Sequence, residues 1–252
     1  MERKGIGPHI SRQFDAELED IRSRVLEMGG LVEQQMGNAV KALVNGDSEL
    51  AEKVITSDYR VNAMEVAIDE ECTLILARRQ PTAIDLRLVI AVIKTITDLE
   101  RIGDEAERIA RMALHLTESS GTLRPLAGVE HLGDLARKML RDALDAFARM
   151  DILAAARILR EDLKVDREYE GVLRQSITFM MEDPRSIPRV VDVMWSARAM
   201  ERTGDRARNI CEYVIYFVKG KDVRHTTIEQ VEAAVGRRAE DITETRGEEQ
   251  GR

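Results

Sequence analysis

Hydrophobic side chains recur at steps of three and four residues along most of the chain, the period of an amphipathic α-helix. In the first such stretch the apolar positions are Leu18, Ile21, Val25, Met28, Val32, Met36, Ala39 and Leu43. The pattern predicts helices over 11–45, 47–79 and 82–116. Gly46 can adopt the left-handed conformation that closes the first helix, and Pro81 ends the second.

The same succession of helices and bends starts again after residues 118–128, a segment rich in Ser, Gly, Thr and Pro. The further predicted helices lie around 132–147, 152–181 and 188–218. Asp151 follows the first new bend as Asp47 follows the earlier one, and Pro184 stands where Pro81 stood. Because the bends repeat at nearly constant spacing, we interpret the chain as an internal duplication.

This duplication predicts an all-α protein of two tandem, pseudo-symmetric three-helix bundles with six long helices. The expected divisions are a flexible N-terminus at 1–10, a first bundle at 11–117, a linker at 118–128, a second bundle at 129–225 and a polar C-terminal tail at 226–252. We interpret the tail as frayed, with only a short possible helix over 228–235.

Composition narrows the function classes. The 252 residues are 33% charged and 4% aromatic, and the net charge of −8 argues against a general nucleic-acid binder. Cys72 and Cys211 lack metal or redox spacing, and no apolar run is long enough to span a membrane or to act as a signal peptide. We therefore expect a cytoplasmic protein with no membrane insertion and with both thiols reduced.

A rare acidic motif occurs once in each half, at 97–111 and at 198–212. The matched pairs include Glu100 with Glu201, Gly103 with Gly204, and Asp104 with Asp205. Two acids four residues apart share one helix face, and the repulsion between their charges is slightly unfavourable. A single copy of the motif would suggest an ordinary solvated face. The second copy, with a costly Gly inside each helix, favours a close approach by a ligand or another chain segment.

Aspartates on the apolar stripes of the second and fifth helices strengthen this interpretation. Asp58 and Asp162 occupy equivalent positions on stripes that otherwise carry Val, Ile and Phe. A carboxylate directed towards a core must pair with an arginine or bind a metal, and the sequence leaves both possibilities open. Asp166 follows Asp162 by one turn, whereas Asn62 stands in the first half, so we expect more negative charge at the second site.

The ligand types limit the metal. The candidates are carboxylates, while His9, His115, His131 and His225 stand outside the motifs, which disfavours zinc and histidine-based di-iron sites. Mg²⁺, Mn²⁺ or oxygen-bridged iron remain. The sequence holds no phosphate-binding glycine loop and no nucleophile at motif spacing from a base, so catalytic residues are not predicted.

The segments DLERIGDEAERIA and AMERTGDRARNICEYVIYFVKGKDVRHT, with ARRQPTAIDLR at the bend, resemble the PhoU family of bacterial phosphate-transport regulators. The resemblance covers about residues 11–226. It implies two three-helix bundles, often dimeric, that carry metals on repeated Glu/Asp-x-x-x-Asp motifs. The implied metal ligands are Glu100, Asp104, Glu201 and Asp205, with Asp58, Asp162 and Asp166 as further ligands. Arg208, which stands where the first motif has Glu107, departs from the pattern.

The resemblance also implies a role without catalysis. The family helps to silence the phosphate-starvation response when phosphate is plentiful. Its members are expected to contact two partners, the ATPase subunit of the high-affinity phosphate ABC transporter and a membrane sensor histidine kinase. The alternatives to such a metal-binding adaptor are a carboxylate-bridged metalloenzyme and a helical scaffold without metal. A metalloenzyme needs an open coordination position and a nearby acid–base or redox group, and no histidine stands near the motifs, which disfavours the enzyme.

Overall fold

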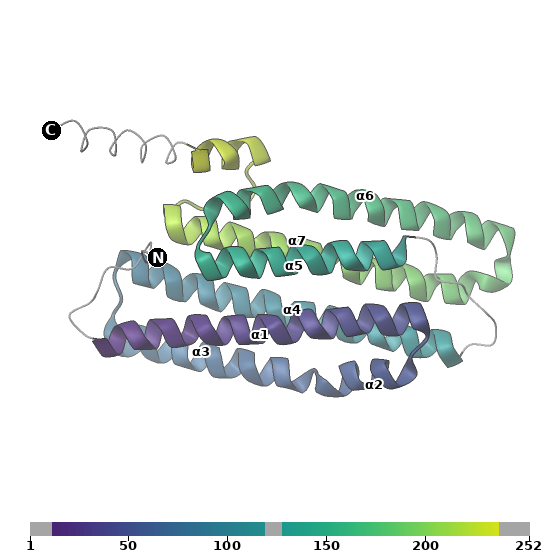
Figure 1. Cartoon of the computed structure of the whole chain (residues 1–252), viewed down its shortest axis with the longest axis horizontal. Helices are drawn as coiled ribbons and strands as arrows, with labels where there is room; N and C mark the ends of the chain where they lie inside the picture. Colours follow the sequence, from purple (N-terminus) through teal and green to yellow (C-terminus); the bar gives the residue numbers. More distant parts are fainter. Residues whose placement is uncertain (1–11, 119–127, 237–252) are drawn as a thin grey trace.

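A computed structural model describes residues 12–118 and 128–236, and within them it confirms an all-α fold with no strand (Figure 1). The helices are α1 (Arg12–Asn45), α2 (Ser48–Ser57), α3 (Tyr59–Arg79), α4 (Ala83–Glu118), α5 (Val129–Arg149), α6 (Ile152–Glu182), the short 3₁₀ helix η1 (Pro184–Ser186) and α7 (Ile187–Lys219). A last helix covers 228–236. No described helix has the length and apolar character needed to cross a membrane.

The predicted corners between helices form by local capping. Asp47 accepts a hydrogen bond from the Leu50 backbone N–H at 3.0 Å and so caps α2. Asp151 does the same for α6, where it accepts from the N–H groups of Leu153 and Ala154, both at 3.0 Å. Gly46 adopts the expected left-handed conformation with φ of 65°. The two bends are therefore fixed by equivalent side chains in the two halves.

The prediction of one unbroken helix over 47–79 is wrong, because the helix is interrupted at Asp58 between α2 and α3. The Asp58 carbonyl accepts from the Val61 N–H at 2.8 Å, a tight i to i+3 contact of the 3₁₀ type. The equivalent residue of the second half, Asp162, lies inside the continuous helix α6. The two halves thus differ at the position where each directs an aspartate inwards.

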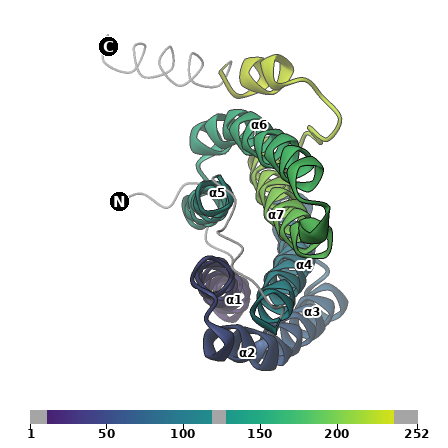
Figure 2. The ribbon, with the colours of Figure 1, turned by 90° about the vertical axis from the view of Figure 1, so that its right-hand side faces the viewer.

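The two bundles pack against each other along their whole length and share one hydrophobic core (Figure 2). Helix α1 lies beside α5 and α4 lies beside α7, while α2 and α3 cover one end of the stack and α6 covers the other. The helices that carry the acidic motif, α4 and α7, are therefore neighbours. The buried Asp98 of α4 joins them, since it accepts from Tyr213 Oη at 2.8 Å and Arg206 Nη1 at 3.2 Å.

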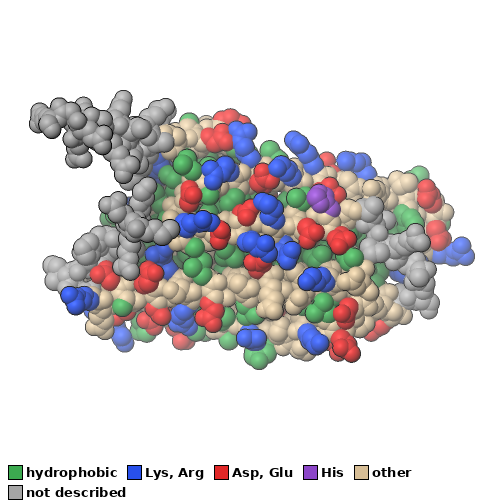
Figure 3. All heavy atoms as spheres, viewed as in Figure 1, with side chains coloured by type: hydrophobic (Ala, Val, Ile, Leu, Met, Phe, Trp, Pro, Cys, Tyr) green, Lys and Arg blue, Asp and Glu red, His purple; other side chains and the backbone are tan. Residues whose placement is uncertain are grey.

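The face formed by α1 and α5 carries interspersed acidic and basic side chains (Figure 3). Some of them pair between the bundles, as Arg141 of α5 does with Glu33 of α1. This face shows no broad basic area of the kind that would bind a nucleic acid.

The short helix that the sequence allowed over 228–235 is present at 228–236, but this stretch is packed against the protein and is not frayed. Val231 and Val235 of this short helix are buried, and Glu232 pairs with Arg160 of α6. Two apolar side chains one turn apart are enough to dock the helix on the second bundle. The predictions for 1–10, for 119–127 within the linker and for 237–252 concern residues outside the described part of the chain.

Candidate metal centre and its repeat

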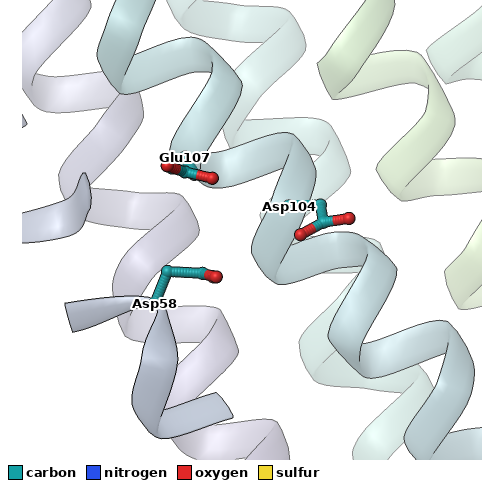
Figure 4. Close-up of side chains that lie close together, drawn as sticks. All are labelled: Asp58, Asp104 and Glu107. Carbon is teal, nitrogen blue, oxygen red and sulfur yellow. The ribbon is translucent and has the colours of Figure 1, made fainter. Parts of the chain in front are cut away.

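Three carboxylates meet between the α2–α3 break and the middle of α4 (Figure 4). Asp104 and Glu107 belong to α4, and Asp58 reaches them from the break. One oxygen of each lies within 4.8 Å of the others. In the described part of the chain, this is the group of three acidic, histidine or cysteine side chains that could hold a metal ion.

Asp58 is the buried member of this trio, 8% exposed. Its Oδ2 accepts from Asn62 Nδ2 at 3.1 Å, while its Oδ1 has no hydrogen-bond partner among the described residues. Burial raises the pKa of Asp58, and the charge of Glu107 raises it further. A buried carboxylate with one unpaired oxygen and two other acids close by is costly without a cation, so these residues fit a hard metal ion.

Gly103 allows this approach. A Cβ atom there would lie 3.2 Å from Asp58 Oδ1 and 3.4 Å from a Val61 methyl group, closer than most side-chain contacts. The glycine therefore marks a close contact by a side chain of the neighbouring helix. Gly204 is in an equivalent place, with its Cβ position 3.2 Å from Val165 and 3.6 Å from Asp162 Oδ1.

Two further acids border the trio. Burial raises the pKa of Glu100, and Asp104, Glu65 and Asp58 raise it further, in that order. Burial is also the main cause that raises the pKa of Glu65 on α3. The candidate Glu100 therefore lies in the electrostatic field of the cluster but outside the trio. Here "first cluster" denotes Asp58, Glu65, Glu100, Asp104 and Glu107.

Sequence reasoning did not select Glu107 or Glu65 as ligands. The signal for Glu107 was its spacing, since Glu100, Asp104 and Glu107 recur at four and three residues on one helix face. Glu65 gave a weaker signal, because it stands two turns after Asp58 on a stretch that was predicted to be regular helix. Glu107 Oε1 also accepts from Arg111 Nε at 3.1 Å, a contact on the exposed side of α4.

The second cluster, Asp162, Asp166, Glu201 and Asp205, is built differently. Arg208 Nη1 donates to Asp162 Oδ2 at 3.2 Å, and Arg198 Nη1 donates to Glu201 Oε1 at 2.6 Å. The expectation of more negative charge at this site is therefore wrong, because arginine cations pair with its most buried acids. These four acids, as arranged, do not fit a metal ion in the way that the first cluster does.

Burial nevertheless dominates at Glu201 and raises its pKa to about 7, with Asp205 adding to the shift and Arg198 opposing it. Its Oε2 has no hydrogen-bond partner in the part of the chain that the structure describes. The short contact with Arg198 would by itself favour the charged form. Three surrounding acids and the loss of solvent outweigh one arginine that remains 40% exposed.

Both halves match one family model. The PhoU domain model matches residues 25–113 and again 129–214, and each match contains one acidic cluster. The chain belongs to the PhoU family. The double match confirms the internal duplication.

Close relatives span nearly the whole chain. The phosphate-specific transport system accessory protein PhoU of Serratia marcescens is 58% identical over 226 residues, 89% of this chain and 92% of the relative. The protein of the same name from Escherichia coli (strain K12) is 56% identical over 226 residues, 89% of this chain and 93% of the relative.

Solved structures agree with the fold. The crystal structure of PhoU from Pseudomonas aeruginosa matches with a TM-score of 0.80 and 53% identity, and covers 82% of this chain and 100% of that one. The phosphate transport system regulatory protein PhoU from Streptococcus pneumoniae gives a TM-score of 0.77 at 33% identity, over 83% of this chain and 99% of that one. Members of the family are accessory and regulatory proteins, and this chain is not an enzyme.

Proposed function

We propose that this protein regulates phosphate uptake and silences the phosphate-starvation response when phosphate is plentiful. Family membership over both halves supports the broad role in phosphate transport, because the relatives are named accessory proteins of a phosphate-specific transport system. In the finer proposal the protein is a cytoplasmic adaptor. It contacts the ATPase subunit of the high-affinity phosphate transporter and a sensor histidine kinase.

In this proposal, a metal ion bound at the first cluster fixes the conformation of the adaptor. Asp58, Asp104 and Glu107 would hold a Mg²⁺, Mn²⁺ or iron ion, with Glu100 and Glu65 adding negative charge beside it. The carrying observation is that Asp58 is buried, keeps one oxygen unpaired among the described residues, and places a carboxylate oxygen within 4.8 Å of ligand atoms on a second helix. A bound cation would neutralise these acids and hold the α2–α3 break against α4. The metal thus serves structure and partner contact rather than catalysis.

Expression of phosphate-starvation genes tests the regulatory role. Deletion of the gene for this chain should make these genes constitutively active in phosphate-rich medium, and the wild-type gene should restore repression. Repression that persists unchanged after deletion would contradict the proposal.

Complementation with variants separates the metal from the adaptor role. Asp58→Asn/Asp104→Asn should restore repression poorly, while Asp162→Asn, a matched change at the equivalent aspartate of the second half, should restore it. Equal repression by both, with both proteins at wild-type abundance, would show that the metal is dispensable for regulation. A homodimer is part of the same proposal, and sedimentation of the purified protein measures it directly.

A further inference from the structure

A cavity of 580 Å³ opens beside the middle and the C-terminal half of α7. It is lined by Arg198, Arg202, Asp205, Arg206, Arg208, Asn209, Glu212, Arg224 and His225. Its volume falls in the range of small-molecule sites, about 300–1,000 Å³. Five of the nine lining residues are arginines, although the chain as a whole has a net charge of −8.

The arginines lie in front of buried acids. The paired acids are Glu201, Glu105, Asp98, Asp162 and Glu212, with side chains only 4–11% exposed, whereas the four α7 arginines that hold them are 21–40% exposed. Of these five acids only Glu212 lines the cavity, and the others lie behind the guanidinium groups, which supply most of the charged lining. A ligand that enters meets positive charge first.

These guanidinium groups retain donors. A guanidinium carries five N–H groups, but Arg202 contacts Glu105 through Nη1 alone, and Arg206 contacts Asp98 through Nη1 alone. Arg206 Nε is buried and has no hydrogen-bond partner within the described residues. Arg224 pairs with the exposed Asp222, so its attachment to the protein is weak. The cavity thus offers several planar donor groups to one acceptor-rich ligand.

We propose that this cavity binds an inorganic phosphate anion, either orthophosphate or a short chain of phosphates. Guanidinium forks match phosphoryl oxygens in geometry and charge. The lining contains no Phe, Tyr, Trp or aliphatic side chain and only one ring, that of His225, so it offers little contact to a base or a sugar, which favours an inorganic ligand over a nucleotide. Asp205 and Glu212 in the wall can accept a hydrogen bond from a protonated phosphate oxygen, which sulfate lacks.

The position of the cavity gives the ligand a way to act on the fold. Arg202 reaches Glu105 and Arg206 reaches Asp98, so both link α7 of the second bundle to α4 of the first. A phosphate that takes donors from these arginines changes the ion pairs between the bundles. This site goes beyond the regulatory role proposed above, and it needs no metal because none of its lining residues belongs to the first cluster.

Titration calorimetry on the full chain, with orthophosphate, pyrophosphate and tripolyphosphate as separate probes, tests the proposal. At least one of them should bind with saturation and more tightly than sulfate at equal ionic strength. Arg202→Gln and Arg224→Gln should each weaken that binding about tenfold, since a charge-assisted hydrogen bond is lost. Arg174→Gln, at an arginine of α6 that is 71% exposed, is the matched control and should change nothing.

The outcomes are distinguishable. Preference for orthophosphate or for a longer chain identifies which inorganic form fits, and either supports the site. Equal affinity for sulfate, tighter binding of ATP than of tripolyphosphate, or equal loss in Arg174→Gln would overturn it. Arg224→Gln disturbs no buried acid, so it stays informative if circular dichroism shows that Arg202→Gln is unfolded. Binding is measured without partners, so its failure leaves the regulatory proposal standing.

Discussion

The two acidic clusters descend from the same repeated motif but solve the problem of buried negative charge in different ways. In the first, Asp58, Asp104 and Glu107 face one another and an Asp58 oxygen stays unpaired. In the second, Arg208 stands at the position of Glu107 and pairs with Asp162. One substitution between the halves thus exchanges an acid for a built-in cation. A repeated motif alone does not make two equal sites.

The largest expected effect concerns metal affinity. Asp58→Asn should weaken Mn²⁺ binding by at least about 10–100-fold. Loss of a residue that only supports a metal ligand already costs that much, and this change removes a direct ligand. Asp162→Asn should leave it unchanged. Titration of metal-free protein with Mn²⁺, monitored by calorimetry, gives both affinities. If the two variants lose affinity equally, the clusters are equivalent and the contrast fails.

The free energy of unfolding should respond unequally at the matched positions 107 and 208. Arg208→Ala leaves the buried Asp162 unpaired, and we expect a loss of about 1–2 kcal/mol, below the cost of breaking a fully buried pair because Arg208 is part-exposed. Glu107→Ala in metal-free protein removes repulsion from Asp58 and a weak surface pair with Arg111, so the net change should be near zero. Urea unfolding without metal measures both. Equal losses would contradict the assignment.

The second cluster should also show a pH dependence. Because the pKa of Glu201 is raised to about 7 from 4.5, the folded state takes up a proton across this window and loses stability as pH rises through it. Glu201→Gln, which imitates the protonated form, should therefore gain roughly 3 kcal/mol over wild type at about pH 8 and little at about pH 4, since each pKa unit corresponds to about 1.4 kcal/mol and the shift already includes the Arg198 pair. Thermal unfolding of both proteins at the two pH values measures this difference in stability. A difference that does not change with pH would show that ionisation of Glu201 is not its cause.

The smallest effect is expected at the glycines. A methyl group at Gly103 would press on Asp58 Oδ1, so Gly103→Ala should weaken Mn²⁺ binding several-fold. Its effect on stability should stay near zero, because alanine gains up to about 1 kcal/mol of helix propensity. Gly204→Ala should leave Mn²⁺ affinity untouched. Should Gly204→Ala weaken metal binding as much, the second cluster takes part in the site.

Much of the fold could be predicted from local signals. The apolar steps placed the helices, Asp47 and Asp151 marked the corners by capping, and the duplicated motif gave the two bundles. The interruption at Asp58 could not be predicted, because its backbone remains helical in φ and ψ and only the hydrogen-bond pattern changes. The short helix at 228–236 was underestimated, since its two buried valines gain stability only from the surface of the second bundle.

The candidate site divides in the same way. The sequence by itself determined which helix face carries Glu100, Asp104 and Glu107, since helical spacing fixes neighbours three and four residues apart. Only the tertiary structure decided that Asp58 meets that face and that Arg208 meets Asp162. Such contacts depend on how far one helix is shifted along another, and on a flexible arginine that can reach acids on several helices. Local periodicity contains neither quantity.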